Sequence, residues 1–208
     1  MPRSDRARVN DSASSCANAP LILASASPRR LDLLRQAGVE PDRAIAADVD
    51  ERALAKETPR QLALRLAQDK ARAVMGLEAG AFVVGADTVV ALGRRVFGKP
   101  DSETDARRML ARLSGRAHRV LTAVAVAAPD GRMASRLSES KVTFKRLSPQ
   151  DLNALIACGE WRGVAGGYRI QGRAAGVIVD LQGSYAGVVG LPLYETLSLL
   201  DGLGFRRF

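Results

Sequence analysis

A β-hairpin inserted into an otherwise alternating series of strands and helices constrains this fold more than any other feature of the sequence. Residues 118–127 and 141–147 are rich in strand-forming residues, and the turn sequence APDGR at 128–132 lies between them. Apolar segments at 20–25 and 81–93 predict two further buried strands, each followed by helical periodicity. Alternation alone favours a parallel sheet, whereas a hairpin adds antiparallel pairs. We therefore predict an α/β domain with a mixed sheet flanked by helices.

The expected helices begin at capping residues and end at glycines. Ser27 with Pro28 begins the first of them, which stops at Gly38. Thr58 and Gln61 form a capping box for a helix that runs to about Gly76. Three later helices are expected after Ser102, after Ser148 and from about Pro192, with strands at 176–181 and 186–191 and a possible bulge at Gly85.

The length of 208 residues suits one domain, which we place at residues 20–208 after a polar tail, 1–19, predicted to be disordered. The sequence lacks an apolar run of the roughly 20 residues that a membrane helix needs, and charged residues interrupt any N-terminal signal sequence. We therefore expect a cytoplasmic protein. Its two cysteines, Cys16 and Cys158, and its single histidine, His118, do not form a zinc-binding pattern.

The net charge of +9 points to an anionic partner. The basic residues are scattered along the chain, and aromatic residues make up only 4% of it, which weighs against a surface that stacks nucleic-acid bases. A small phosphate-bearing ligand is therefore favoured over nucleic acid. The nucleic-acid alternative would predict an affinity that falls steeply with salt.

The segment SASPRR at 25–30 combines several anion-binding groups at the start of one helix. The first turn of a helix presents unpaired N–H groups and a partial positive charge. Ser25 and Ser27 add hydroxyl groups, and Arg29 and Arg30 add guanidinium groups, so the segment can bind a phosphate. An ordinary capped helix with solvated arginines would give the same sequence.

Two charged residues interrupt apolar patterns. Asp87 lies in the middle of the strand predicted at 81–93, where a carboxylate is costly unless it is paired or binds a metal. Lys70 falls on the apolar stripe of the helix that begins after Thr58. Two interpretations of Lys70 remain open on this evidence: a side chain that extends its amine to water, or a functional residue.

Three further segments carry polar groups with alternative explanations. The carboxylates of Asp48, Asp50 and Glu51 form either a solvated loop or a set of Mg²⁺ ligands. The segment GRRVFGKP at 93–100 resembles a P-loop but has proline where the magnesium-binding hydroxyl should stand, which excludes that motif and leaves Lys99 as a candidate phosphate ligand. Gln171, in GGYRIQG, offers an amide that can both donate and accept.

Taken together, these segments resemble the Maf family of nucleotide pyrophosphatases. The resemblance is carried by eight motifs in order from about residue 20 to the end of the chain: SASPRR (25–30), DVDE (48–51), LAQDKA (66–71), GADTVV (85–90), FGKP (97–100), SGRAHRVLT (114–122), GGYRIQG (166–172) and VVGLPL (188–193).

The resemblance implies an inosine-triphosphatase-like α/β fold with two lobes around a cleft. It implies hydrolysis of a nucleoside triphosphate to the monophosphate and pyrophosphate, with a divalent cation, Mg²⁺ or Mn²⁺, and often a homodimer. Asp87 corresponds to the catalytic proton acceptor, with the metal held by Glu51 or Asp87. The other expected site residues are Glu51, Lys70 and Lys99 beside Asp87, and Ser25, Ser27, Arg29 and Arg30 at the phosphates.

At three positions the chain resembles the family branch that acts on dTTP and UTP, which typically has an arginine, a threonine and a glutamine there. These residues are Arg29, Thr88 and Gln171. A glutamine amide can accept from N3–H and donate to O4 of thymine or uracil, whereas the edge of cytosine is reversed. The chain departs from the usual family pattern at Val164, Arg169 and Ala186-Gly187. Members of the family have also been linked to inhibition of septum formation, so a regulator that acts through protein partners without hydrolysis is the alternative.

Overall fold

The computed structural model describes residues 19–206, and the predicted tail at 1–19 lies almost wholly outside this range. The helices are α1 (Pro28–Gln36), α2 (Pro59–Met75), α3 (Glu103–Leu113), α4 (Pro149–Ala157), α5 (Tyr185–Val189) and α6 (Leu193–Leu203), with short 3₁₀ turns η3 (Ala165–Gly167) and η4 (Arg173–Val177). The strands are β1 (Leu21–Ala24), β2 (Arg43–Ala44), β3 (Phe82–Leu92), β4 (Arg95–Phe97), β5 (Ala117–Ala127), β6 (Met133–Phe144) and β7 (Ile178–Gln182).

The strands form one mixed sheet, as the hairpin predicts. Its order is β2-β1-β3-β5-β6-β7, and β4 pairs with β3 beyond the end of β1. Strand β1 is parallel to β2 and β3, and all other pairs are antiparallel. The predicted hairpin forms β5 and β6, which pair along their whole length from Ala117↔Thr143 to Ala127↔Met133.

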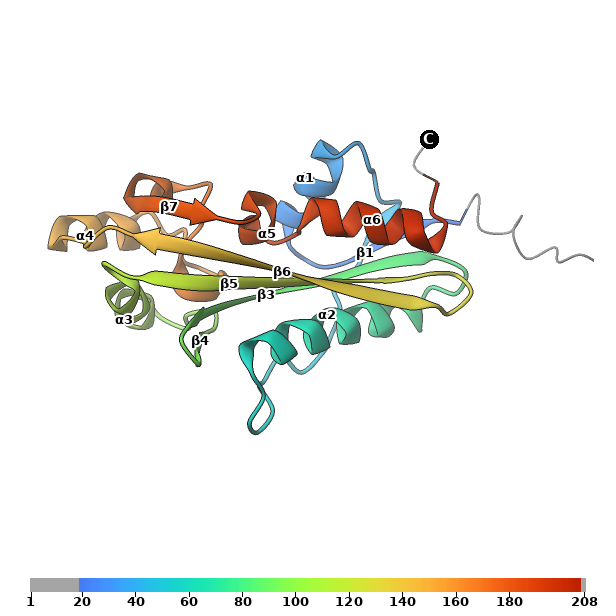
Figure 1. Cartoon of the computed structure of the whole chain (residues 1–208), viewed down its shortest axis with the longest axis horizontal. Helices are drawn as coiled ribbons and strands as arrows, with labels where there is room; N and C mark the ends of the chain where they lie inside the picture. Colours follow the sequence, from blue (N-terminus) through green and yellow to red (C-terminus); the bar gives the residue numbers. More distant parts are fainter. Residues whose placement is uncertain (1–18, 207–208) are drawn as a thin grey trace, which may run out of the picture.

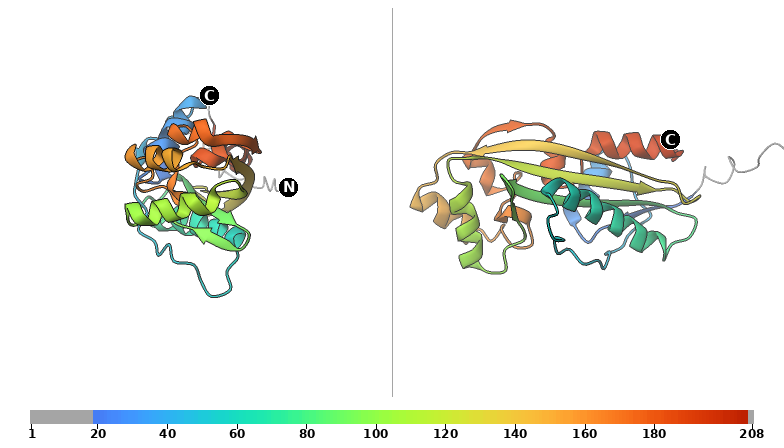
Figure 2. Two further views of the ribbon diagram at one scale, coloured as in Figure 1. Left: turned by 90° about the vertical axis from the view of Figure 1, so that its left-hand side faces the viewer. Right: turned by 60° about the horizontal axis from the view of Figure 1, so that its bottom comes forward.

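The molecule has two lobes, one at each end of the long strands β3, β5 and β6. Two apolar cores, one on each face of the sheet, belong to the first lobe, and a third core belongs to the second. In one lobe, α2 packs on one face of the sheet and α1 and α6 cover the other (Figure 1). In the second lobe, α3, α4 and the 3₁₀ turns surround the other ends of β3, β5 and β6. The two views in Figure 2 show the same elongated sheet passing through both lobes. The expectation of two lobes is confirmed.

The pairing of β3 leaves a short gap on one of its edges. Strand β1 pairs with β3 up to Ala24↔Gly85, and β4 pairs with it only from Val90↔Phe97 onward. Among the described strands, none therefore pairs with residues 86–89 of β3 on this side, although β5 pairs with them on the other. Because successive side chains of a strand point to opposite faces, neighbouring residues in this gap reach into different surroundings.

The close packing of α2 on β3 depends on Gly85. A Cβ atom at this position would clash with the carbonyl oxygen of Ala67 and would lie 2.6 Å from the backbone nitrogen of Ala71. The bulge that we expected at Gly85 is wrong, because the β3–β5 register runs without interruption from Val83 to Ala91. The glycine instead lets the backbone of α2 approach the strand, two residues before Asp87.

One predicted strand is a helix. Residues 186–191 were expected to extend the sheet, but Tyr185–Val189 form α5. The hydroxyl of Ser184 caps this helix by accepting a hydrogen bond from the backbone N–H of Gly187, and Gly190, with φ of 140°, ends it. The strand prediction was based on Val188 and Val189, which favour strands. The cap at Ser184 and the helix end at Gly190 stabilise a short helix instead.

The other expected helix starts are confirmed. Thr58 and Gln61 form the predicted capping box of α2, and Ser102 and Ser148 cap α3 and α4. The segment 93–100 forms the β3–β4 turn, β4 and the loop that follows it, and no helix begins at Gly98 or Lys99, since α3 starts only at Glu103; this agrees with the exclusion of a P-loop. Of the helices within residues 19–206, none combines the length and apolarity needed to cross a membrane.

Candidate active site

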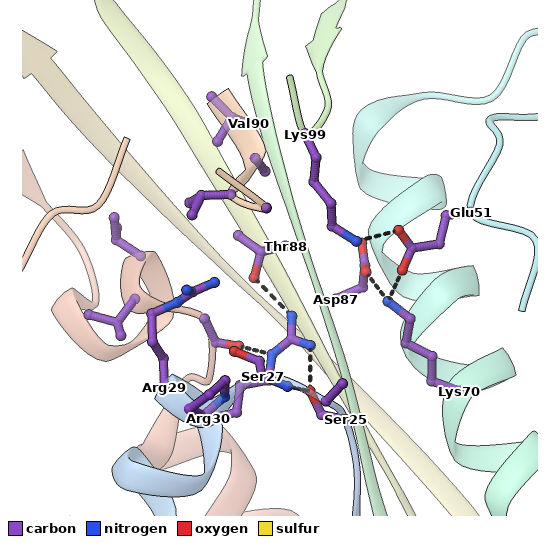
Figure 3. Close-up of a pocket in the computed structure, with 18 of the residues that line it drawn as sticks. Ser25, Ser27, Arg29, Arg30, Glu51, Lys70, Asp87, Thr88, Val90 and Lys99 are labelled. Carbon is purple, nitrogen blue, oxygen red and sulfur yellow. Dashed lines mark hydrogen bonds and ion pairs between the residues drawn. The ribbon is translucent and has the colours of Figure 1, made fainter. Parts of the chain in front are cut away.

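A cavity of about 330 Å³ lies at the gap in the β3 edge, between the two lobes. Figure 3 shows its side chains converging from α1, α2, the loop before α2, β3 and the segment after β4. Nine of the ten sequence-predicted site residues line it: Ser25, Ser27, Arg29, Arg30, Glu51, Lys70, Asp87, Thr88 and Lys99.

On the α2 side of β3, four charged side chains form a chain of ion pairs. Lys70 Nζ lies 2.5 Å from Asp87 Oδ1 and 2.7 Å from Glu51 Oε1, and Lys99 Nζ lies 2.7 Å from Glu51 Oε2. Asp87 and Lys70 are buried, at 8% and 7% exposure. The alternative that Lys70 extends its amine to water is therefore wrong, because the amine is held between two carboxylates. We call these four residues the carboxylate–lysine group.

The helix α2 also holds the loop that carries Glu51. The guanidinium of Arg65 donates to the carboxylate of Glu57, at 2.7 Å from Nε, and to the backbone carbonyl of Arg52, at 2.9 Å from Nη2. Arg65 and Lys70 lie on the same helix, so the segment that fixes the lysine also fixes its carboxylate partner. Asp50, in contrast, pairs with the exposed Arg52 and does not line the cavity, and Asp48 is exposed outside it.

The charges of the carboxylate–lysine group cancel. Burial raises the pKa of Glu51, but hydrogen bonds and charge from Lys70 and Lys99 outweigh that effect and lower the pKa to about 2. Glu51 is therefore ionised at neutral pH, and its two oxygens face two ammonium groups. Within residues 19–206, no hydrogen bond engages the second oxygen of Asp87, Oδ2, so it remains able to accept a proton.

On the other side of β3, Arg30 is held by neutral acceptors. Its Nε donates to the carbonyl of Gly190 at 2.8 Å, Nη1 to Ser25 Oγ at 3.2 Å and Nη2 to Thr88 Oγ1 at 3.4 Å (Figure 3). Within the described range, neither Arg30 nor Arg29 forms a salt bridge. Burial lowers the pKa of Arg30, although the charges of Asp87 and Glu51 act in the opposite direction. We call Ser25, Ser27, Arg29, Arg30 and Thr88 the arginine–hydroxyl group.

Arg29, within this group, and Arg169, near it, add positive charge that no salt bridge neutralises within residues 19–206. Burial, and then the positive charges of Arg169 and Arg30, lower the pKa of Arg29. Arg169 Nε is buried without a hydrogen-bond partner in the described part of the chain. Ser27 occupies the N-cap position of α1, but its hydroxyl makes no capping bond, so the expected cap is present in position only. This side of the cavity therefore offers donors and positive charge to an anion.

The carboxylates fit a metal that takes most of its ligands from substrate. No group of three or more His, Cys, Asp or Glu residues that could hold a metal occurs within residues 19–206. Each carboxylate has about four lone-pair positions, and the lysines use two of them on Glu51 and one on Asp87. Mg²⁺ binds through one or two carboxylates together with phosphate oxygens and water. Glu51 and Asp87 fit that requirement.

Gln171 is the one predicted site residue that the structure places outside the cavity lining, and its side chain is exposed. Sequence reasoning missed Tyr168, which forms part of the cavity wall and is held by a 2.7 Å hydrogen bond between its hydroxyl and His118 Nε2. Burial lowers the pKa of His118 to about 4, so this histidine is neutral at pH 7. The buried aromatic pair could not be seen in the sequence, because its members are 50 residues apart.

The family model described as Maf-like protein matches residues 20–203, nearly the whole of the described chain. The chain belongs to the Maf family. Residues 20–203 of this Maf-family chain contain every residue of both groups that line the cavity, and the resemblance noted in the sequence is confirmed.

Relatives of this Maf-family chain are more than 50% identical to it over the aligned residues. A protein named dTTP/UTP pyrophosphatase from Caulobacter vibrioides is 62% identical, covering 89% of this chain and 96% of its own. Proteins of the same name from Hyphomonas neptunium and Maricaulis maris are 55% and 56% identical, covering 91% and 89% of this chain and 98% and 88% of their own.

Among solved structures, a nucleoside triphosphatase named dITP/XTP pyrophosphatase from Mycobacterium abscessus is similar at 19% identity, with a TM-score of 0.39. The match covers 61% of this Maf-family chain and 73% of the other.

Proposed function

We propose that this protein hydrolyses nucleoside triphosphates, with dTTP and UTP as its substrates, to the monophosphate and pyrophosphate. One observation carries the proposal: within residues 19–206, the same cavity is lined by a carboxylate whose second oxygen has no hydrogen bond and by two arginines that form no salt bridge. The first supplies a proton acceptor and the second supplies a site for a polyphosphate. The names of the relatives, at 55–62% identity, supply the substrates.

In the reaction we propose, water attacks the α-phosphorus. Asp87 Oδ2 accepts the proton of that water, while Lys70, hydrogen-bonded to Oδ1, fixes the orientation of the carboxylate. The bond between the α-phosphorus and the bridging oxygen breaks, and the pyrophosphate leaves with the electron pair. Glu51 holds the two lysine amines in place, and these amines stabilise charge on the phosphoryl oxygens.

The arginine–hydroxyl group binds the part of the substrate that leaves. Pyrophosphate carries most of the negative charge of the triphosphate, and Arg29 and Arg30 are the cavity cations that no carboxylate neutralises within the described residues. The start of α1 adds unpaired backbone donors beside Ser25 and Ser27.

A divalent cation, Mg²⁺ or Mn²⁺, would be held by Glu51 and Asp87 together with the substrate phosphates. When bound, it neutralises part of the charge of the triphosphate. Glu51 and Asp87 can share their oxygens between such an ion and the lysines, since both carboxylates have unused lone pairs.

We assign the choice of the base to Gln171, whereas Arg29 and Thr88 share with it only the resemblance to the branch that acts on dTTP and UTP. The amide of Gln171 can accept from N3–H and donate to O4 of thymine or uracil, and the reversed edge of cytosine would meet donor with donor. Gln171 lies three residues after Tyr168, which lines the cavity, and its side chain is exposed.

The test is pyrophosphate release by the purified protein with Mg²⁺ or Mn²⁺ and each of dTTP, UTP, CTP, GTP and 7-methyl-GTP. We expect release from dTTP and UTP that is lost in Asp87→Asn. A regulator that acts only through protein partners would release none from any nucleotide, and that result would overturn the proposal. The intact pairing of Asp87, Lys70 and Glu51 favours the enzyme over that regulator.

A further inference from the structure

A row of three hydrogen bonds connects the cavity to a fully buried threonine. Thr122, on β5, lies directly opposite Thr88 in the β3–β5 register and is 0% exposed. Its Oγ1 lies 2.7 Å from the carbonyl oxygen of Gly187, in α5, and 3.1 Å from Thr88 Oγ1. Thr88 Oγ1 in turn lies 3.4 Å from Arg30 Nη2.

The direction of each bond in this row follows from chemistry. A carbonyl oxygen can only accept, so Thr122 must donate its single hydroxyl proton to Gly187. The shorter bond, 2.7 Å, is the one that requires this proton. Thr122 can then only accept from Thr88, and Thr88 must donate to it. A guanidinium can only donate, so Thr88 accepts from Arg30.

The row therefore runs in one direction, from Arg30 through Thr88 and Thr122 to the Gly187 carbonyl. Thr88 directs its proton away from the cavity and its oxygen toward Arg30. Among the three acceptors of Arg30, Thr88 is the one that holds Nη2. Gly187 and Gly190, both in or next to α5, supply the two carbonyls at the ends of this arrangement.

We propose that Thr122 is a positioning residue for phosphate binding, because it fixes the hydroxyl of Thr88 as the acceptor that orients the Arg30 guanidinium. The inference rests on the proposed function, since it assumes that Arg30 meets the phosphates of a nucleotide. Thr122 is buried behind Thr88 and acts through it. Without the Thr122 hydroxyl, Thr88 loses the acceptor for its proton, and both its hydroxyl and its side-chain rotamer are less restricted.

The variant that tests this is Thr122→Val, which keeps the shape of the side chain and removes the hydroxyl. We expect it to raise KM for dTTP about fivefold, the effect of one hydrogen bond of ordinary strength, with kcat within about twofold of the wild type. Thr122→Ser keeps the hydroxyl and should keep KM near the wild-type value.

Thr196→Val is the matched control for loss of a buried hydroxyl. Thr196 is also 0% exposed, and its hydroxyl donates to the carbonyl of Pro192 at 2.7 Å, within α6 and outside the cavity lining. Both valine variants lower the melting temperature if buried hydroxyls matter for stability, but only Thr122→Val should raise KM. An equal rise of KM in both variants would reduce Thr122 to a structural role.

A double variant tests the route of the effect. If Thr122 acts through Thr88, then Thr88→Val and the double variant Thr88→Val, Thr122→Val have the same KM. If Thr122→Val still raises KM in the Thr88→Val background, Thr122 acts on Arg30 through its bond to α5 and the carbonyl of Gly190, and the proposal is wrong.

Binding of tripolyphosphate separates this inference from the proposed function. Calorimetry of tripolyphosphate binding needs no turnover, and Thr122→Val should weaken it by the same factor that raises KM. If the wild type hydrolyses dTTP but tripolyphosphate binds both proteins equally, the proposal for Thr122 fails and the function stands. If no nucleotide is hydrolysed but the fivefold weakening is observed, the function fails and the positioning of Arg30 by Thr122 stands.

Discussion

Asp87 and Thr88 are neighbours in the chain, yet they serve two sides of the cavity that differ in electrostatic design. Asp87 points toward α2, where two carboxylates and two lysines neutralise one another. Thr88 points toward α1 and α5, where Arg30 is held by a carbonyl and two hydroxyls and keeps its full charge. Strand alternation produces this difference within two residues.

The comparison separates two tasks. A balanced group can move a proton without attracting ions in the absence of substrate, and an unbalanced group binds an anion. We therefore expect substitutions in the carboxylate–lysine group to change kcat, and those in the arginine–hydroxyl group to change KM.

The largest effect is expected for Asp87→Asn. Loss of the proton acceptor should lower kcat for dTTP about 10³-fold and leave KM within about threefold, as measured by steady-state pyrophosphate release. Asp180→Asn, which removes an exposed carboxylate on β7, is the control and should leave both constants unchanged. A rise in KM larger than the fall in kcat would break the separation of tasks.

Lys70→Met should lower kcat about 10²-fold and also destabilise the fold. The substitution leaves Asp87 buried without its cation, which costs about 3 kcal/mol of unfolding free energy by urea titration. Adding Asp87→Asn to Lys70→Met should recover most of that stability without recovering activity. No recovery would show that the buried pair is not the source of the loss.

Arg30→Lys should raise KM for dTTP about tenfold with a smaller change in kcat. A lysine amine cannot reach the three acceptors that the guanidinium fork contacts. Arg35→Lys, on the same helix and paired with Glu40 on the surface, is the matched control. The separation would be contradicted if Arg30→Lys lowered kcat as strongly as Asp87→Asn.

The smallest effect concerns pH and stability. Since the lysines lower the pKa of Glu51 from 4.5 to about 2, this carboxylate stabilises the folded state fully above pH 4.5, and less as the pH falls toward 2. The difference in melting temperature between wild type and Glu51→Gln should therefore shrink over that window. The difference for Arg30→Lys should stay constant there, since neither side chain titrates. A Glu51→Gln difference that is as large at pH 3 as above pH 4.5 would contradict the pairing.

The sequence predicted most of the elements, and nine of the ten site residues that it predicted line the cavity, for identifiable reasons. Asp87 and Lys70 each interrupt an apolar pattern, and the capping residues mark where α1 and α2 begin. The strand prediction for residues 186–191 is wrong. Valines favour strands, but the capping hydroxyl of Ser184 and the positive φ of Gly190 delimit a helix there.

Other features depend on contacts between distant segments. The row from Arg30 to Gly187 joins residues from α1, β3, β5 and α5, and only the sheet register brings Thr122 behind Thr88. Gly85 is a second example, because an isolated glycine within a strand pattern indicates a β-bulge when only the sequence is known. Its actual role depends on how closely α2 approaches.

The measurement that tests the account most directly is hydrolysis of dTTP in water enriched in ¹⁸O, with mass analysis of both products. If the carboxylate–lysine group delivers water to the α-phosphorus while the arginine–hydroxyl group holds the leaving pyrophosphate, one ¹⁸O atom enters the monophosphate and none enters the pyrophosphate. Label in the pyrophosphate would mean attack at the β-phosphorus and would contradict the division of the cavity proposed here.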